Sequence, residues 1–329
     1  MSEIPPLSIQ RVDDGALILA ADVVLDQLGV GGDGVFLVVS NPELGAIATE
    51  LAEAARRRTE RAEMQEFGPT GRDGAEPPDA VAAAMRASSV VALVTCFSLS
   101  HTLARAAATH AGARIASLPG ITAEIFARTI PVDYDQLQRV GSALTSKLTG
   151  AGRCRVTAPA GTDVELALRG RAAICDDGDL RASGAWGNLP AGEAFIAPLE
   201  TEATGTIVFD GSLAGWGLLD QPLSIELERG RLVTAAGGAA AEWLLATLDA
   251  GGPNGRTIAE LGIGTNPNAT ITGVILEDEK VEGTVHFAFG TNTSIGGANQ
   301  ASVHIDALVQ NALVELDGYP ILRDGRLLD

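Results

Sequence analysis

The sequence predicts an α/β domain with a mainly parallel sheet, followed by an α+β domain with a mainly antiparallel sheet. Over residues 1–152, buried apolar strands alternate with helices, which is typical of doubly wound parallel sheets. Beyond Gly150-Ala151-Gly152 the strands become short, alternate in polarity and are separated by glycines, which favours antiparallel pairing. The length of 329 residues also exceeds what one core usually holds. We therefore expect domains at residues 1–152 and 153–329.

In the first domain, strands and helices are predicted in turn along the chain. Apolar runs predict strands at residues 16–20, 35–40, 89–95 and 113–117. Helices are predicted at about 42–61, from 78 onward, from Ser100 to about His110, and at 133–148. Asp79 in a first turn and Gly112 after a last turn are typical of helix ends.

In the second domain, the predicted strands are short and joined by glycine turns. They lie at residues 155–157, 164–168, 206–209 and 224–228. One helix is predicted at 239–248. An antiparallel sheet with few helices is the architecture that this pattern favours.

The composition argues against several kinds of partner. The formal net charge of −19 disfavours nucleic acid and anionic membrane surfaces, because both are bound through clustered Lys and Arg. No apolar stretch reaches the roughly 18 residues that a membrane span requires. The three cysteines are widely spaced and odd in number, which suggests no disulfide framework. We therefore expect a reduced, cytoplasmic setting.

Two of the four histidines lie close together in strand-like segments of the second half. His286 lies in Gly283-Thr-Val-His-Phe-Ala-Phe-Gly290, and His304 begins His304-Ile-Asp306. Because strand side chains alternate with period two, His304 and Asp306 are expected on the same side of one strand. Imidazoles and carboxylates together are typical ligands of divalent metals. The alternative is that both histidines are hydrogen-bonded core residues.

Two glutamates extend this candidate metal site. Glu260 lies between apolar residues, where a buried carboxylate must be paired or bound to metal. A Gly-rich stretch follows it and allows other groups to approach closely, so Glu260 is the candidate bridge between two ions. Glu193 is a further candidate ligand, with a surface strand end as its alternative. Asp278-Glu279-Lys280 is interpreted as a solvated turn.

Four motifs of the second half resemble those of the aminopeptidase T family of leucyl aminopeptidases. They are Asn188-Leu-Pro-Ala-Gly-Glu-Ala-Phe-Ile-Ala-Pro198, Ala259-Glu-Leu-Gly-Ile-Gly-Thr-Asn-Pro267, Glu279-Lys280 with Gly283-Thr-Val-His-Phe-Ala-Phe-Gly290, and Ser302-Val-His-Ile-Asp306. The resemblance implies two metal ions, commonly zinc or cobalt, held by Glu193, Glu260, His286, His304 and Asp306. It also implies a dimer with an N-terminal α/β domain.

The sequence departs from this family at one position. The peptidases carry a tyrosine seven residues after the first motif histidine, and this chain has Thr293 there. The related superfamily branch of 2,5-dihydroxypyridine dioxygenases uses iron(II), and Ser98-Leu-Ser-His-Thr102 resembles a motif of that branch. His286, His304 and Asp306 would suit a 2-His-1-carboxylate iron site.

Residues of the first half are predicted to face the substrate. His101 follows a strand and precedes a helix, at the rim where open α/β sheets bind ligands. It is a candidate acid or base, whose alternative is a histidine bonded to local backbone. Arg105 lies one turn later and could hold a substrate carboxylate, with a surface arginine as the alternative. Ser100 is the third candidate of this group.

These observations lead to a first hypothesis and two alternatives. The first is a metal-dependent hydrolase that cleaves an amide or related bond of a small molecule or short peptide, with one or two Zn, Co or Mn ions and with His101 and Glu193 as catalytic residues. The second is a mononuclear iron(II) ring-cleaving dioxygenase that acts on a hydroxypyridine-like aromatic. The third is a protein without catalysis, whose metal is structural or absent. A homodimer is expected in each enzymatic case.

Overall fold

The computed structural model describes residues 12–32 and 34–328, which form two compact units. Unit 1 consists of Met1–Pro131 and Asp179–Leu189, and unit 2 of Val132–Gly178 and Pro190–Asp329. The sequence prediction placed its one boundary at residue 152. The structure instead changes units at residue 131, and the later segment Asp179–Leu189 returns to unit 1.

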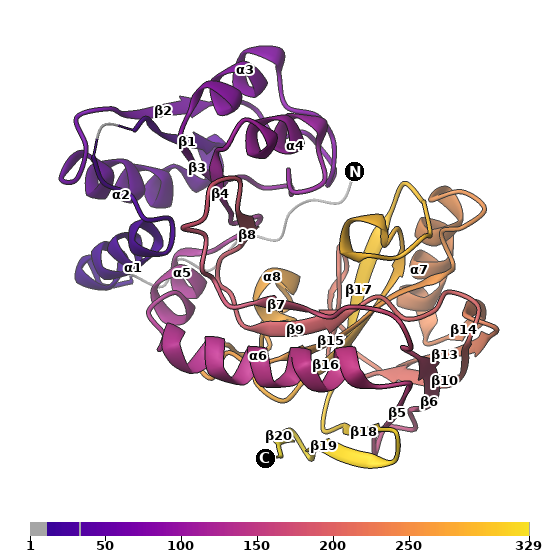
Figure 1. Cartoon of the computed structure of the whole chain (residues 1–329). Coiled ribbons are helices and arrows are strands. Elements are labelled where there is room, and N and C mark those ends of the chain that lie inside the picture. The colour runs from indigo at the N-terminus through magenta and orange to yellow at the C-terminus, as the bar shows by residue number, and fades with distance from the viewer. Residues whose placement is uncertain (1–11, 33, 329) are drawn as a thin grey trace. The chain divides into compact units, whose positions relative to one another are not determined.

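Unit 1 contains a five-stranded sheet in which every pairing is parallel, as predicted for the first half. The strand order is β2-β1-β3-β4-β8 (Figure 1). Their bounds are β1 Phe36–Ser40, β2 Ala62–Glu66, β3 Val90–Val94, β4 Arg114–Ser117 and β8 Trp186–Asn188. All residues of the central strands β1 and β3 are buried, which explains their unbroken apolar sequence.

Helices cover both faces of this sheet. They are α1 Asp14–Gln27, the short η1 Pro42–Leu44, α2 Gly45–Arg56, α3 Asp79–Ala87, α4 Leu103–His110 and α5 Ala123–Thr129. Figure 1 shows α1 and α2 on one side of the sheet and α3 and α4 on the other. The strand predicted at residues 16–20 is wrong, because this run is part of α1. The side chain of Asp13 caps that helix by accepting a hydrogen bond from the backbone N–H of Gly15.

Unit 2 contains two antiparallel sheets, which confirms the fold class predicted for the second half. The eight-stranded sheet has the order β14-β13-β10-β6-β5-β18-β19-β20. Its strands are β5 Arg153–Thr157, β6 Asp163–Ala167, β10 Ala203–Phe209, β13 Leu223–Glu228, β14 Arg231–Ala236, β18 Leu313–Leu316, β19 Tyr319–Arg323 and β20 Arg326–Leu327.

The seven-stranded sheet has the order β12-β11-β17-β16-β15-β9-β7. Its strands are β7 Ile174–Asp176, β9 Glu193–Ile196, β11 Ser212–Leu213, β12 Gly217–Leu218, β15 Ile258–Gly264, β16 Val285–Gly290 and β17 His304–Val309. Apolar side chains of both sheets form one core with helices α6 Tyr134–Gly150 and α7 Gly238–Ala250. This core holds one face of the seven-stranded sheet, including Leu261, Phe287 and Phe289.

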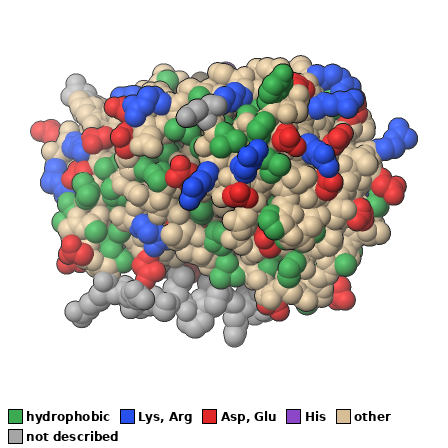
Figure 2. Space-filling model, turned by 90° about the horizontal axis from the view of Figure 1, so that it is seen from below, with side chains coloured by type: hydrophobic (Ala, Val, Ile, Leu, Met, Phe, Trp, Pro, Cys, Tyr) green, Lys and Arg blue, Asp and Glu red, His purple; other side chains and the backbone are tan. Residues whose placement is uncertain are grey.

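Two shorter elements complete unit 2. They are α8 Ile275–Asp278 and the 3-10 turn η2 Thr293–Ile295. Within residues 12–32 and 34–328, no helix combines the length and the apolar character that crossing a membrane requires. On the face drawn in Figure 2, acidic and basic side chains are interspersed.

Candidate metal centre

The five predicted ligands lie on four adjacent strands of the seven-stranded sheet. Glu193 begins β9, Glu260 lies in β15, His286 in β16, and His304 and Asp306 in β17. The strand order β17-β16-β15-β9 brings these segments side by side although they span more than a hundred residues of sequence. Every second residue of a strand points to the same face of its sheet. By this alternation and the strand pairing, the five side chains share one face. The apolar residues between them face the core.

Each ligand candidate stands opposite a glycine or an alanine on one of its neighbouring strands. The paired positions are Glu193 with Gly264, Glu260 with Ala288, His286 with Gly262, His304 with Gly290, and Asp306 with Ala288. Small residues at these positions leave room for the carboxylates and imidazoles to lie across the sheet. A break in register between Ile258 and Glu260 adds a bulge, which redirects the side chain of Glu260.

Glu260 lies between the two imidazoles. Its Oε1 lies 3.4 Å from Nε2 of His286, and its Oε2 lies 3.5 Å from Nε2 of His304. Glu193 Oε2 lies 3.2 Å from the same His286 nitrogen, and Asp306 Oδ1 lies 3.6 Å from Nε2 of His304. Glu193, Glu260 and His286 each offer one possible metal-ligand atom, and these three atoms all lie within 4.8 Å of one another. This is the arrangement expected of a bridging carboxylate.

The charges of this cluster are consistent with a cation site. Burial alone would raise the pKa of Glu260, but hydrogen bonds from His286 and His304 outweigh it and hold that pKa below its usual range. Burial disfavours a charged His286, yet its interactions with the carboxylates of Glu193 and Glu260 hold its pKa well above the usual value. The pKa of His304 is also raised, since Asp306 and Glu260 outweigh its burial. The carboxylates of this cluster are therefore stabilised by positive charge close to them, which protons on the imidazoles or a metal ion can supply.

The donors present fit a divalent metal. Oxygen Oε2 of Glu193 is buried without a hydrogen-bond partner, although it faces Nε2 of His286. A buried carboxylate oxygen in this condition is costly unless a cation contacts it. Carboxylates and imidazoles together suit zinc, manganese, cobalt and iron.

A buried lysine adjoins the cluster, and the prediction for its segment is wrong. Asp278-Glu279-Lys280 is not a solvated turn, because the exposed fractions of the three residues are 0%, 8% and 0%. Nζ of Lys280 lies 2.5 Å from Glu193 Oε1, 2.7 Å from Glu279 Oε1 and 3.5 Å from Asp176 Oδ2. The buried position of Lys280 was missed because two of its three partners, Asp176 and Glu193, lie far from it in the sequence. In the sequence, Glu279-Lys280 stood out only as part of a family motif, which gave neither residue a role.

The loop before β17 fixes His304. Nδ1 of His304 lies 2.8 Å from the backbone oxygen of Thr291, so Nε2 points towards Glu260 and Asp306. The side chain of Asn292 accepts from the backbone N–H of Asn299 and donates to Glu200. Thr293, at the tyrosine position of the peptidases, lies on the exposed turn that follows. The tyrosines are elsewhere, Tyr134 in α6 and Tyr319 in β19.

The three candidates of the first half lie together in unit 1, Ser100 and His101 between β3 and α4 and Arg105 in the first turn of α4. The side-chain hydroxyl of Ser100 donates to that of Ser117 at 3.0 Å. Arg105 places its guanidinium 3.9 Å from the centre of the Trp186 ring and donates through Nε to the backbone oxygen of Ser100. The ring of His101 meets the same tryptophan edge-on at 6.1 Å. Trp186 lies in β8 and was not singled out from the sequence. Substrate roles for Ser100, His101 and Arg105 remain predictions.

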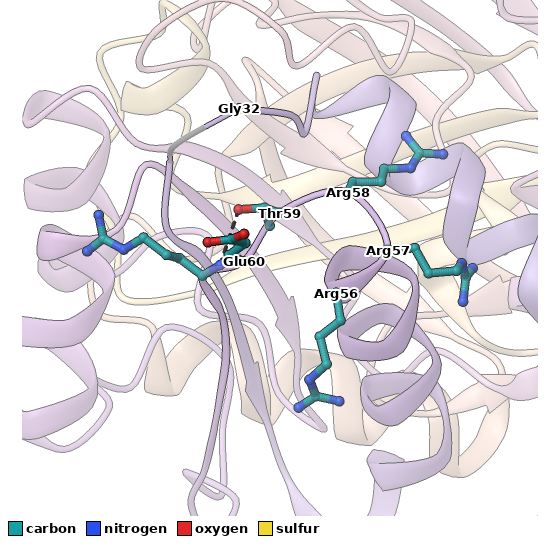
Figure 3. A pocket seen from close by; sticks show the side chains of 7 residues that line it. Gly32, Arg56, Arg57, Arg58, Thr59 and Glu60 are labelled. Atoms are coloured by element: carbon teal, nitrogen blue, oxygen red, sulfur yellow. Dashed lines mark hydrogen bonds between the residues drawn. The ribbon is translucent and has the colours of Figure 1, made fainter.

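Unit 1 also has a cavity of about 450 Å³ lined by Gly32 and residues 56–61 (Figure 3). Two of its arginines are paired with acids of α1, Arg57 with Asp22 and Arg58 with both Asp22 and Asp26. None of the predicted site residues lines this cavity. It is therefore separate from the metal-ligand cluster, which lies in unit 2.

Comparisons with known proteins agree with the motif resemblance. The family model described as 2,5-dihydroxypyridine 5,6-dioxygenase matches residues 36–329. The solved structure of 2,5-dihydroxypyridine dioxygenase from Pseudomonas putida is similar with a TM-score of 0.82 and 22% identity, covering 96% of this chain and 98% of that one. Wild-type AmpT from Thermus thermophilus is similar with a TM-score of 0.76 and 18% identity, covering 96% and 99%. A search of curated protein sequences found no match. The family match confirms the resemblance to the dioxygenase branch, and the likeness to AmpT shows a shared fold.

Proposed function

We propose a function for this chain from its family: it belongs to the 2,5-dihydroxypyridine 5,6-dioxygenase family, a family of enzymes. The proposed activity is iron(II)-dependent ring cleavage of a hydroxypyridine-like aromatic by dioxygen. The single observation that carries this choice is the family match over residues 36–329. Thr293 supports it, because the hydrolytic branch has a tyrosine at that position.

The residues of the metal centre have distinct proposed roles. His286, His304 and Asp306 would hold the iron as two imidazoles and one carboxylate. Glu260, which lies against both imidazoles, would orient them or complete the ligand set. Bound iron(II) would supply the redox chemistry with dioxygen that protein side chains lack.

The residues of unit 1 are proposed to handle the substrate. The Trp186 ring, with the guanidinium of Arg105 over it, offers an aromatic and cationic surface for an anionic aromatic ring. His101 would move a proton at the substrate hydroxyl, since imidazole titrates near neutral pH. A homodimeric state and a cytoplasmic location are further proposals.

Anaerobic loading with iron(II), followed by oxygen uptake in the presence of a hydroxypyridine panel, tests the proposed activity. We expect uptake with at least one compound and loss of uptake in His286→Ala. The matched control is His110→Ala, which removes an imidazole from the exposed end of α4. Absence of uptake across the panel by the iron-loaded protein would contradict the proposal.

A two-metal amide hydrolase is the second candidate. The observation in its favour is that the two oxygens of Glu260 face different imidazoles, which suits one cation beside each oxygen. Elemental analysis of protein purified without added metal separates the candidates. Two zinc-like ions per chain with cleavage of a peptide amide would favour the hydrolase, whereas one iron per chain would favour the dioxygenase.

A further inference from the structure

Lys280 is fully buried and surrounded by acids. The chain contains 2 lysines, Lys147 and Lys280, among its 23 basic residues. Lys147 is exposed on α6, whereas the side chain of Lys280 has 0% exposure. Burying an ammonium is costly unless it is paired and its hydrogen bonds are satisfied. Its surroundings therefore have to supply both the charge and the acceptors.

The carboxylates around Lys280 match the donors of an ammonium. An ammonium has three N–H donors, and Nζ has three carboxylate neighbours, in Glu193, Glu279 and Asp176. A planar guanidinium could not point donors in the same three directions. With its donors committed and its side chain buried, Lys280 has no group left to contact a substrate.

The backbone also connects Lys280 with Glu193. The backbone N–H of Asn266 donates to the oxygen of Lys280 at 2.8 Å. The side chain of Asn266 donates to the oxygen of Ala191 at 2.8 Å, two residues before Glu193. One asparagine thus fixes the segments that carry the ammonium and its nearest carboxylate.

Lys280 contacts one oxygen of Glu193, and the other oxygen faces the metal-ligand cluster. Oε1 of Glu193 accepts from Lys280, while Oε2 lies beside His286 without a hydrogen-bond partner. We propose that Lys280 is a positioning residue of the metal centre, which holds Glu193 by Oε1 and so presents Oε2 to the bound cation. This inference rests on the metal centre that the proposed function requires, and it is independent of the reaction catalysed there.

Cobalt(II) binding to the full chain tests this role without any activity measurement. Affinity is measured by competition with a chromogenic chelator, and ligand geometry by the visible absorption of the bound ion. We expect Lys280→Met to weaken binding by roughly 10–100-fold, the usual effect of losing a residue that supports a ligand. We also expect its absorption spectrum to change. Lys147→Met is the matched control and should bind as the wild type does.

A double-mutant cycle shows whether Lys280 acts through Glu193. Glu193→Gln should weaken binding, and Lys280→Met should add no further weakening in that background. If the two effects multiply, or if Lys280→Met binds cobalt as the wild type does, the inference is wrong. If the wild type binds no cobalt, the metal centre and the proposed function fail together.

A second variant covers the case in which Lys280→Met does not fold, which circular dichroism will reveal. Asp176→Asn keeps the ammonium and removes the charge of its most distant neighbour. It should weaken cobalt binding several-fold in the wild-type background and have no effect in the Glu193→Gln background. An unchanged affinity in the wild-type background would overturn the inference.

Discussion

The imidazole of His286 lies directly against the backbone of Gly262 on the neighbouring strand. A Cβ atom added to Gly262 would lie 2.0 Å from Nε2 of His286, which is far inside the contact distance of real atoms. The two residues are paired across β15 and β16. The glycine therefore provides the space in which the imidazole reaches Glu260 and Glu193.

Gly262→Ala should displace His286 and weaken metal binding by more than roughly 10-fold, because the ligand can no longer lie across the strand. Cobalt titration measures the affinity, and urea unfolding measures the stability of the fold. Gly150→Ala is the control, since an added Cβ there meets no atom within 4 Å. Wild-type affinity in Gly262→Ala would show that His286 does not bind the metal from this position.

Glu260→Gln should abolish most metal binding. The substitution keeps the shape of the side chain and removes the charge that lies between the two imidazoles. We expect affinity to fall by more than about 100-fold, beyond the effect of losing a supporting residue. Inductively coupled plasma analysis of the purified variant gives its metal content. Glu228→Gln, on the exposed face of β13, should retain the wild-type content.

Metal binding should strengthen as pH rises. In the metal-free protein the pKa values of His286 and His304 are raised above the usual range, so each imidazole carries a proton that a metal must displace. Affinity should therefore increase between about pH 6 and about pH 8, with proton release on binding. Cobalt titrations in weakly buffered solution measure both quantities. Binding that is independent of pH would exclude the two imidazoles as ligands.

The raised pKa values of His286 and His304 also affect the stability of the metal-free fold, which should change with pH in the opposite direction to metal affinity. Histidines whose pKa is raised in the folded state stabilise the metal-free fold fully below about pH 6.5, their unfolded value. This contribution is lost as pH rises through the folded-state values. The melting temperature of the metal-free protein should therefore fall with rising pH above neutrality, and added metal should reverse the fall.

Asn292→Ala should loosen the loop that fixes His304. Asn292 is fully buried, and its side chain holds both Asn299 and Glu200. Leaving such partners unsatisfied costs about 1–3 kcal/mol, and urea unfolding measures the loss. Gln300→Ala, at an exposed position of the same loop, is the control. Equal stability of the two variants would contradict this role for Asn292.

The parts of the fold that follow from local pattern were predictable from the sequence. The runs at 35–40 and 89–95 became β1 and β3, because buried parallel strands are continuously apolar. The run at 16–20 was misinterpreted, because a short apolar run does not distinguish a strand from a buried helix. Strand β8 was missed, since its three residues are defined only by pairing with β4, about seventy positions earlier.

For the candidate metal centre too, local features could be predicted from the sequence and features that depend on distant residues could not. His304 and Asp306 share a side of β17 as period two requires. The glycine-rich stretch after Glu260 was expected to allow close approach, and Gly262 does so for His286. The burial of Lys280 could not be predicted, because a charged trio is usually solvated and only the fold brings Asp176 and Glu193 to it.

The return of Asp179–Leu189 to unit 1 has a consequence for handling the protein in pieces. A fragment that stops at Pro131 would lack β8 and leave β4 as an unprotected edge of its sheet. The rest of the chain would begin with α6 and would still contain β8, without the strand β4 with which β8 pairs. Neither unit can be released by a single cut, so a separately expressed unit 1 would need the two segments joined by a new linker.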